Sequence, residues 1–480
     1  MSARGGGAES GRAESGHAES GRAESGHAES GRAESGQGQA QPWSARRMHF
    51  VGVGGAGMSG YARAAHALGA RVSGSDRADS PYLERLRADG VLTASIGHAA
   101  TNVPAEDGVE VIYSSAVAAD NPERAAARER GLPERPRAEL LGELSALKRT
   151  IAVAGTHGKT TTAAMLVYAL RGAGMNPGWL IGGELGGGLP NARWEAGDWL
   201  VVEADESDRS MLSLTVEIAV VSNVELDHHA TYGSLAELHE VFREFLAAAA
   251  KAVVWNRPEL LALCARAPVA YDAPNPQLTA GGSRFRWHEH EVRLAVPGAH
   301  NALNASGALE AARLAGADMQ RAIAGLADFH GAERRFQRLG PGPGEAELYE
   351  DYAHHPTEIE ATLKAARTLH HKRLVAIFQP HLYSRTAQLA RELGEALALA
   401  DVVAVTGIYP ARERGEDHPG VSGLLVAEAA ADAGHGRPVY WLPDFAQALP
   451  VLRGVLRGGD LCLVMGAGDI NLLGRELVLG

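Results

Sequence analysis

The sequence predicts an α/β protein of three domains: a Rossmann-like N-terminal domain, a central mononucleotide-binding domain of the P-loop type, and a C-terminal Rossmann-like domain. Three observations support this fold class. The length of 480 residues suggests about three domains at ~150 residues each. Short apolar runs alternate with helical stretches, which is typical of mostly parallel sheets. Two glycine-rich turns each follow an apolar run and precede a helical stretch, as in nucleotide-binding folds.

Composition and charge exclude several classes of protein. The net charge is −12, so the chain lacks the polybasic character of proteins that bind nucleic acid or anionic lipid. No run of 18 apolar residues is present and the N-terminus lacks an apolar signal region, so we expect no membrane span and no secretion. The only two cysteines, Cys264 and Cys462, do not form a disulfide framework. These features favour a cytoplasmic globular protein.

The first segment is a low-complexity tail. Residues 8–36 hold six copies of Ala-Glu-Ser-Gly separated by single Arg or His residues. The five-residue period fits neither a helix nor a strand, and no large apolar side chain is present to offset the ordering entropy by burial. We therefore predict a disordered tail over residues 1–44. Its repeated histidines, His17 and His27, could bind a metal, but a solvated tail or an upstream start-codon artefact is the favoured interpretation.

The N-terminal domain is predicted over residues 45–148. Its expected elements are strands at 48–53, 71–76 and 109–113 and a helix at 61–68. The turn Gly52-x-Gly54-x-x-Gly57 fits the dinucleotide fingerprint, with Asp76 placed to bind a ribose hydroxyl. The same turn can hold any nucleotide diphosphate, or can serve packing alone, so NAD is one of three alternatives. Gly55 makes the turn richer in glycine than the fingerprint requires and would let a ligand approach the backbone closely.

The central domain is predicted over residues 149–329 and contains the most informative segment of the chain. A strand at 151–153 leads into a glycine-rich turn at 154–162, and a helix follows at 163–170. Backbone N–H groups and the positive end of the helix would converge on phosphates there. Lys159 would reach the terminal phosphates and the Thr160 hydroxyl would face Mg²⁺. The general pattern requires a glycine at position 153, which is valine here, so a tight strand-to-helix turn with an incidental lysine is the alternative.

Acidic and histidine residues follow two further strands of this domain. Four carboxylates occupy residues 203–208 directly after a strand at 199–202, and we expect Glu203 to be the Mg²⁺ ligand rather than part of a solvated acidic loop. A second strand at 218–221 is followed by Asn223 and, five residues on, by His228, which could complete the metal site or contact phosphate. Helices at 235–250 and 302–315 would cover the sheet.

The C-terminal domain is predicted over residues 330–480, with strands at 374–379, 402–406 and 461–465. Residues 351–358 join a strand to a helix that Thr357 or a neighbour would cap, with Pro356 in its first turn. Capping does not explain two adjacent histidines after an aspartate and a tyrosine. Arg385 follows the strand at 374–379 and could hold a carboxylate at two points, or pair with an acid of the same domain.

Taken together, these segments resemble the Mur ligase family of ATP-dependent amide-forming enzymes of cell-wall synthesis. The resemblance runs in order from Met48 to the C-terminus, and only the repeat tail lies outside it. The segments that carry it are 52–60 (GVGGAGMSG), 155–162 (GTHGKTTT), 203–208 (EADESD), 300–304 (HNALN), 331–336 (GAERRF), 351–358 (DYAHHPTE), 378–386 (FQPHLYSRT) and 466–470 (GAGDI). Each segment alone is of modest specificity, but the ordered set is highly specific.

The resemblance implies an activity. ATP would activate the lactyl carboxylate of UDP-N-acetylmuramate as an acyl phosphate, and L-alanine would displace the phosphate. The product would be a peptidoglycan precursor, with consequences for cell shape and division. ATP and Mg²⁺ would be required, and the protein would be a monomer or weak homodimer with no nucleic-acid or membrane partner.

The resemblance also implies site residues. The UDP part would lie against Gly54, Gly55, Ala56, Gly57, Ser114 and Ser115, with Asp76 and His98 weaker candidates. ATP would contact Gly155, Thr156, His157, Gly158, Lys159, Thr160, Thr161, Asn301, Arg335 and Asp351. Mg²⁺ would be held by Thr160, Glu203 and His228. The catalytic residues would be Lys159, His354, His381 and Arg385. Tyr352, His381 and Arg385 would surround L-alanine, with Arg385 on its carboxylate.

Two positions depart from the family pattern, and three alternatives stay open. Leu382 stands where many relatives carry arginine, and Glu350 stands where a second aspartate often precedes the tyrosine. A related recycling ligase adds a tripeptide to the same sugar nucleotide. A nicotinamide-dependent oxidoreductase built on the first glycine turn would leave the segments at 155–162 and 203–208 without a role. A nucleotide-binding module without catalysis would leave His381 and Arg385 unexplained.

Overall fold

In the computed structural model the described residues are 41–227 and 231–479, and the chain from Gln41 onward forms one compact unit. Most of the predicted tail and the predicted metal ligand His228 therefore lie outside the described residues. Residues 41–44 form a turn within the compact unit, where Trp43 is buried and the Arg46 guanidinium lies 4.4 Å from its ring centre. Residues 41–44, which we assigned to the tail, therefore pack within the compact unit.

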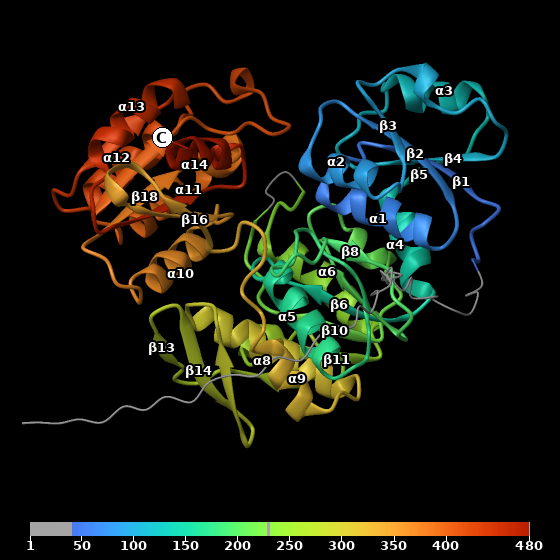
Figure 1. The fold of residues 1–480 in the computed structure, drawn as a ribbon, viewed down its shortest axis with the longest axis horizontal. Coiled ribbons are helices and arrows are strands. Elements are labelled where there is room, and N and C mark those ends of the chain that lie inside the picture. The colour runs from blue at the N-terminus through green and yellow to red at the C-terminus, as the bar shows by residue number, and fades with distance from the viewer. Residues whose placement is uncertain (1–40, 228–230, 480) are drawn as a thin grey trace, which may run out of the picture. The chain divides into compact units, whose positions relative to one another are not determined.

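The first sheet is fully parallel, with the spatial order β3-β2-β1-β4-β5 (Figure 1). Its strands are β1 (Arg47–Val51), β2 (Arg71–Asp76), β3 (Thr93–Ile96), β4 (Val109–Tyr113) and β5 (Glu134–Pro136). Its helices are α1 (Ala56–Ala67), α2 (Pro81–Ala88), α3 (Pro122–Glu129) and α4 (Arg137–Ala146). The chain runs outward from β1 in both directions, so the turn after β1 lies where the strand order reverses, the usual ligand position in such sheets.

The central sheet has seven strands in the order β12-β11-β10-β6-β9-β7-β8, parallel except for β8. Its strands are β6 (Arg149–Ala154), β7 (Gly178–Leu180), β8 (Ala192–Arg193), β9 (Trp199–Glu203), β10 (Ile218–Val221), β11 (Lys251–Trp255) and β12 (Val269–Tyr271). The accompanying helices are α5 (Lys159–Gly172), α6 (Leu235–Ala248), α7 (Pro258–Leu261), α8 (Ala299–Leu314) and α9 (Met319–Leu326). The middle strands β6 and β10 are almost wholly buried, as expected for a sheet covered on both faces.

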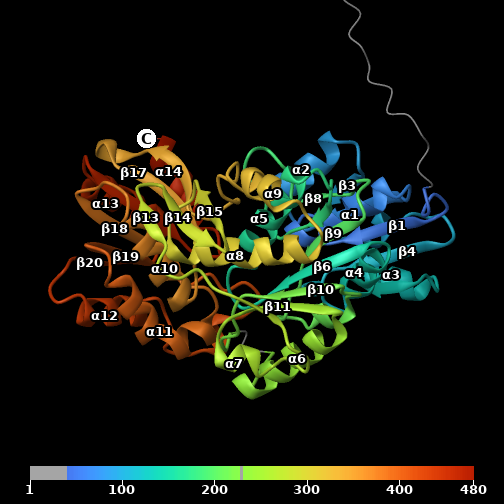
Figure 2. The same ribbon diagram turned by 90° about the horizontal axis from the view of Figure 1, so that it is seen from below.

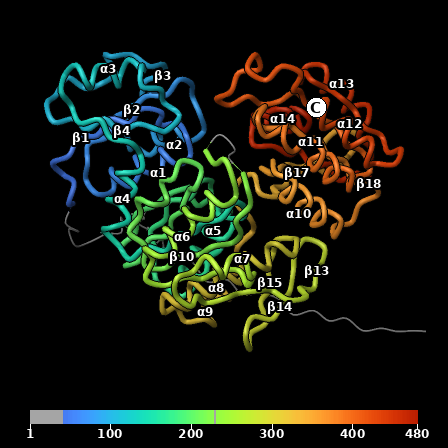
Figure 3. The backbone as a smooth tube through the Cα atoms, turned by 180° about the vertical axis from the view of Figure 1, so that it is seen from behind, coloured from blue at the N-terminus to red at the C-terminus, as the bar shows by residue number. Residues whose placement is uncertain are grey.

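A small antiparallel sheet that we did not predict adjoins helix α8 (Figures 1 and 3). It consists of β13 (Gln277–Thr279), β14 (Gly282–Trp287) and β15 (His290–Leu294). Phe285 and Trp287 of β14 are buried in the same apolar cluster as α8. The small sheet therefore extends the core of the central domain.

The third sheet has six strands in the order β16-β17-β21-β18-β19-β20, of which only β16 is antiparallel to its neighbour. Its strands are β16 (Gln337–Pro341), β17 (Glu347–Asp351), β18 (Arg373–Phe378), β19 (Val402–Thr406), β20 (Val439–Leu442) and β21 (Asp460–Met465). Its helices are α10 (Pro356–Ala366), α11 (Tyr383–Leu397), α12 (Leu424–Ala433), α13 (Phe445–Val455) and α14 (Ile470–Leu479). Figure 2 shows α11 and α12 on one face of this sheet and α13 and α14 on the other. The predicted three-domain α/β class is confirmed.

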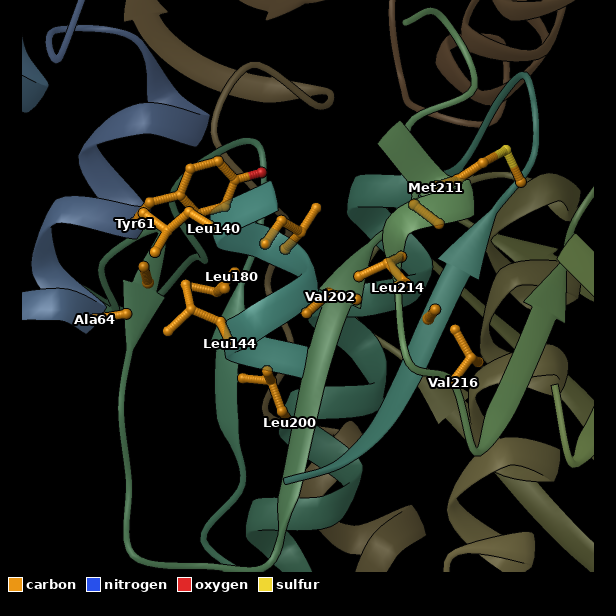
Figure 4. Close-up of a cluster of buried hydrophobic side chains, with 14 of the residues drawn as sticks. Tyr61, Ala64, Leu140, Leu144, Leu180, Leu200, Val202, Met211, Leu214 and Val216 are labelled. Atoms are coloured by element: carbon orange, nitrogen blue, oxygen red, sulfur yellow. The ribbon is translucent and has the colours of Figure 1, made fainter. Parts of the chain in front are cut away.

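Apolar side chains connect the first and central domains (Figure 4). Leu140 and Leu144 of α4 are fully buried and point towards Leu180 of β7 and Leu200 of β9 in the central sheet. Burying such a leucine contributes roughly 1.5–3 kcal/mol. Gly60 of α1 is needed for close approach, since a Cβ there would lie 3.1 Å from the Ala192 Cβ. This packing holds the first glycine turn near the second.

Candidate active site

The turn after β6 is fitted closely against its neighbours. Gly155 has φ +134°, and a Cβ there would lie 2.2 Å from the Ser222 Oγ at the end of β10. Gly158 has φ +80°, and a Cβ there would lie 2.8 Å from the Asn304 Oδ1 of α8. Only glycine fits either position. No side chain caps the N-terminus of α5, so its first N–H groups remain available to an anion.

Lys159 is folded back over this turn. Its Nζ donates to the Gly155 carbonyl at 2.6 Å and lies 3.0 Å from both carboxylate oxygens of Glu206. Burial alone would lower the pKa of Lys159, but the nearby carboxylates of Glu206 and Asp205 outweigh it and raise that pKa. Glu206 was not predicted as the partner of Lys159, because four carboxylates lie within six residues and the sequence does not distinguish them.

The acidic segment after β9 is not a solvated loop. The Glu203 carboxylate accepts from the Gly182 N–H at 2.7 Å and from the Thr160 hydroxyl. Asp205 and Asp208 hold the Arg137 guanidinium of α4 at 3.0 and 2.5 Å. Burial raises the pKa of Glu203. Thr160 and Glu203 present oxygen ligands of the kind that Mg²⁺ prefers, so these residues fit the ion.

A cavity of about 1350 Å³ joins the three domains. Its wall includes Gly54, Gly55, Ala56, Gly57, Asp76, His98, Ser114, Thr156, Gly158, Lys159, Thr160, Glu203, Arg335, Tyr352, His354, His381 and Arg385. Sequence segments more than 300 residues apart therefore meet around one space. The predicted contact Ser115 is not part of this wall.

The first glycine turn is held in shape by an acid. The Gly54 N–H donates to the Asp76 carboxylate at 2.8 Å, and a Cβ at Gly54 would lie 3.0 Å from that oxygen. Asp76 therefore positions the turn in addition to lining the cavity. A Cβ at Gly55 would meet no atom within 4 Å, so the backbone is open to a ligand there, as its position in the turn suggested. His98 hydrogen-bonds Ser75 and Glu123.

A second cavity of about 380 Å³ holds the remaining predicted ATP contacts except Gly155, which lines neither cavity. Its wall includes His157, Gly158, Thr161, Asn301, Arg335 and Asp351. Asn301 donates to the Pro297 carbonyl at 2.7 Å. Asp351 accepts from the backbone N–H groups of Phe336 and Ala353, both at 2.7 Å, and burial raises its pKa to about 6. Gly158, Arg335 and Glu358 border both cavities, so one elongated ligand could occupy the two.

His157 connects the phosphate turn to helix α10. Its Nδ1 lies 3.3 Å from the Glu358 carboxylate and its Nε2 lies 3.4 Å from that of Glu225. Burial alone would lower the pKa of His157, but the charges of Glu358 and Glu225 outweigh it and raise the pKa to about 9. The Thr357 hydroxyl also donates to Glu225, at 2.7 Å. His157, Glu225 and His355 offer ligand atoms within 4.8 Å of one another and could hold a metal ion instead of the proton.

His354 and His381 line the large cavity next to each other and are uncharged, and the His354 Nδ1 lies 3.2 Å from the Glu358 carboxylate that also contacts His157. Burial lowers the pKa of His354 to about 4 and that of His381 to about 3. Their ring centres are 5.8 Å apart, and the His381 ring stacks on Tyr409. His354 Nδ1 lies 3.0 Å from the Tyr352 carbonyl, so the tautomer that donates there leaves Nε2 as an acceptor.

Arg385 is already paired with a carboxylate of the protein. Its Nε and Nη2 both donate to one oxygen of Asp227, at 2.9 and 2.7 Å, and its Nη1 lies 3.0 Å from the His381 Nδ1. Both partners of the ion pair are 3% exposed. Asp227 belongs to the central domain, whereas the alternative prediction paired Arg385 with an acid of its own C-terminal domain. Contact with a substrate carboxylate at two points would require Arg385 to move away from Asp227.

Comparison with known proteins covers nearly the whole chain. Residues 47–149, 153–312 and 334–468 match the models described as "Mur ligase family, catalytic domain", "Mur ligase middle domain" and "Mur ligase, glutamate ligase domain". The UDP-N-acetylmuramate–L-alanine ligase of Rubrobacter xylanophilus is 44% identical over 90% of this chain and 99% of that protein. The corresponding ligase of Saccharopolyspora erythraea is 42% identical over 90% and 92%.

Solved structures show the same relationship. The UDP-N-acetylmuramate-alanine ligase of Thermotoga maritima superposes with a TM-score of 0.77 at 27% identity, covering 90% of this chain and 98% of that one. A murein peptide ligase from Psychrobacter arcticus gives a TM-score of 0.68 at 23% identity, with 90% and 98% coverage, and at that identity it shows the fold alone.

Proposed function

The chain belongs to the Mur ligase family, and from this premise we propose that it is an ATP-dependent ligase that joins L-alanine to the lactyl carboxylate of UDP-N-acetylmuramate in peptidoglycan precursor synthesis. The observation that carries the proposal is the large cavity, which brings both glycine turns and the His354–His381 pair around one space. Such a space suits a reaction that must join three substrates. Family membership removes the nicotinamide-dependent oxidoreductase and the binding module without catalysis.

The chemistry requires activation, because a carboxylate does not condense with an amine in water. A lactyl carboxylate oxygen attacks the γ-phosphorus of ATP, the bond to the β–γ bridging oxygen breaks, and ADP leaves. The alanine ammonium group first loses one proton to solvent. The neutral nitrogen then attacks the acyl carbon, the bond from carbon to the phosphate oxygen breaks, and inorganic phosphate leaves with the second proton released by the nitrogen. Positioning and charge neutralisation dominate such transfers.

Each domain has a proposed part in this reaction. We assign residues 45–148 to UDP binding, 149–329 to ATP and 330–480 to the amino acid. The nucleoside of ATP would lie in the smaller cavity beside Asn301 and Asp351, and the phosphates would lie on the turn at 155–161. Mg²⁺ would be held by Thr160 and Glu203, with His228 as a further proposed ligand, and it would offset phosphate charge.

The phosphate end requires a rearrangement of Lys159. Its ammonium group is occupied by two carbonyls and by Glu206 in the ligand-free site. Binding a triphosphate would draw Lys159 towards the new anion, where its charge stabilises the transferring phosphoryl group. Arg335, which lies 3.9 Å from Glu358 and borders both cavities, would approach the same group from the third domain.

The amino-acid end is suited to an amine. His354 and His381 are uncharged, so they do not repel an incoming ammonium group. The free acceptor of His354 can accept a hydrogen bond from the amine and orient it towards the acyl carbon. Tyr352 borders the same region.

We place the reaction in the cytoplasm, because Cys264 and Cys462 are both free thiols, as expected in a reducing compartment. Separately, no helix among the described residues is long and apolar enough to cross a membrane.

Incubation of the protein with UDP-N-acetylmuramate, ATP, Mg²⁺ and single amino acids tests the proposal. ADP and a ligated product should form with L-alanine, and positional isotope exchange in ATP should be seen with the sugar nucleotide, as expected for an acyl phosphate. Turnover with a tripeptide in place of L-alanine would instead identify the recycling ligase. No ADP with any acceptor would refute ligase activity.

A further inference from the structure

The amino-acid end of the large cavity must bind a substrate that carries a carboxylate. The substrate carries a carboxylate next to its amine, and a charge-assisted contact with a cationic side chain would hold that carboxylate in place. Seven arginines line the cavity: Arg77, Arg137, Arg334, Arg335, Arg385, Arg412 and Arg475. The question is which of them is free to take that carboxylate beside His381.

Most of these guanidinium groups already have partners. Arg385 is held by Asp227 and His381 as described above, and Arg137 is held by Asp205 and Asp208. Arg334 donates to Glu350 at 2.5 Å and to the carbonyls of Gly466 and Gly468. Arg335 lies over the Tyr352 ring and towards Glu358, where ATP is proposed to bind.

Arg412 differs from these in having no such partner. Within residues 41–227 and 231–479, its side chain makes no hydrogen bond and no ion pair. It follows β19 and lines the cavity together with His381, Leu382 and Tyr409. It is also close enough to His381 for its charge to lower the pKa of that imidazole. Of the two other arginines without an ion pair, Arg77 adjoins Asp76 in the first domain and Arg475 acts on Glu350 from α14.

The segment that carries Arg412 is fixed to the segment that carries His381. The Tyr409 N–H donates to the Pro380 carbonyl at 2.8 Å, and the Leu382 N–H donates to the Tyr409 carbonyl at 2.9 Å. On the other side of Arg412, the Glu413 carboxylate accepts from the Ser384 N–H at 3.0 Å. Arg412 thus lies between two anchors on the same turn, and its backbone is ordered before any ligand binds.

Because position 382 is a leucine, the positive charge at this end of the cavity has to come from another residue, and Arg412 can supply it. The Leu382 side chain is 7% exposed and lines the cavity between His381 and the start of α11, but it offers no charge. With Arg385 committed to Asp227 and both histidines uncharged, Arg412 supplies the one guanidinium of this region that lacks a protein partner in the described part of the chain.

We propose that Arg412 binds the carboxylate of the incoming amino acid and thereby selects α-amino acids over simple amines. The inference rests on the proposed ligase function. Holding the carboxylate at Arg412 directs the adjacent amine back towards His381 and His354, into the space between the two glycine turns. Arg412 is a substrate-binding residue in this account and takes no part in proton transfer.

The test compares Arg412→Ala and Arg412→Gln with the wild type in steady-state ADP release. Loss of one charge-assisted contact should raise KM for L-alanine by about 10- to 100-fold. The KM values for ATP and UDP-N-acetylmuramate should stay within about twofold, which also reports that the variants are folded. Arg414→Ala is the matched control, since Arg414 is exposed on the same segment but does not line the cavity, and its KM for L-alanine should not change.

L-Alaninamide separates carboxylate binding from a general structural role. It has the amine but no carboxylate, so the wild type and both Arg412 variants should use it with the same kcat/KM. An unchanged KM for L-alanine in an active Arg412→Ala enzyme would overturn the inference. So would an equal loss with L-alanine and L-alaninamide. A wild type that releases no ADP with any amino acid would refute the proposed function itself, which is a distinguishable result.

Discussion

The two ends of the large cavity differ in the charge of their side chains and in how their cations are paired. At the phosphate end the cations are paired with protein carboxylates: Lys159 with Glu206, Arg137 with Asp205 and Asp208, and His157 with Glu358 and Glu225. At the amino-acid end Arg385 is also paired, with Asp227, but the two histidines are uncharged and Arg412 has no ion-pair partner among the described residues.

The difference follows from the charge of the proposed substrates. A triphosphate is a polyanion, so its site needs several cations, and cations buried without partners would destabilise the ligand-free protein. The internal carboxylates stabilise them until ATP and its cation arrive. An amino acid has no net charge at neutral pH, so its site needs only one exposed cation for the carboxylate and an uncharged surface for the amine.

Removing the central cation of the phosphate end should have the largest effect. Lys159→Ala should lower kcat/KM by about 10³-fold or more, since a preorganised contact to the transferring phosphoryl group is lost. Lys251→Ala, an exposed lysine on β11 of the same sheet, is the control and should be within about twofold of the wild type. ADP release measures both variants, and undiminished turnover in Lys159→Ala would refute the proposed role of the turn.

Breaking the buried ion pair between the central and C-terminal domains should have the next largest effect. Asp227→Asn leaves the Arg385 guanidinium buried without its anion, which should cost about 3 kcal/mol of stability. The midpoint of urea unfolding should fall accordingly. Asp401→Asn, which breaks a partly exposed pair with Arg367, should shift the midpoint much less. Equal shifts of the unfolding midpoint in the two variants would contradict the expected difference between a buried and a partly exposed ion pair.

The phosphate turn and most of the fold could be predicted because their signals are local. The strand, the glycine turn and the helix at 151–170 are adjacent in sequence, and the structure reproduces them. The parallel sheets follow from alternating apolar runs in the same way. The small sheet also had a local signal, since Ser283 to Trp287 alternates buried and exposed residues, but we did not apply the period-two pattern there.

The pairing of charges could not be predicted, because it depends on long-range geometry. Arg385 and Asp227 are 158 residues apart and belong to different domains, so no spacing rule connects them. Which of the four carboxylates at 203–208 faces Lys159 depends on how the chain turns after β9, and the answer was Glu206. No sequence pattern points to Arg412. Its role is inferred because the neighbouring arginines have ion-pair or hydrogen-bond partners in the protein and Arg412 has none among the described residues.

The charged state of His157 should appear as a pH dependence of stability. Its pKa is about 9 in the folded protein against about 6.5 when unfolded. A raised histidine pKa stabilises the fold at low pH, and this contribution is lost as pH rises through 9. Between pH 7 and pH 9.5 the loss should be about 2 kcal/mol. A Glu358→Gln variant, which removes the main cause of the raised pKa, should show a flatter profile in urea unfolding, and an identical slope would contradict the assignment.

The histidines at the amino-acid end should show the smallest change with pH, in contrast to His157 at the phosphate end. His354 and His381 have pKa values of about 4 and 3 because they are buried, so neither changes charge between pH 5.5 and pH 9.5, the range in which His157 titrates. Heteronuclear NMR of histidine-labelled protein, assigned with His157→Gln and His381→Gln variants, can follow the rings in one titration. We expect the His157 signals to move with a midpoint near 9 while those of His354 and His381 stay in place.

The effect of His354 and His381 on stability has the opposite pH dependence to that of His157. Below pH 6.5 the unfolded chain takes up protons at these two histidines and the folded chain does not, so acidification should lower stability through them. A His381 midpoint near 6.5 would mean that this end of the cavity carries charge at neutral pH, and it would remove the reason for assigning the amine to it.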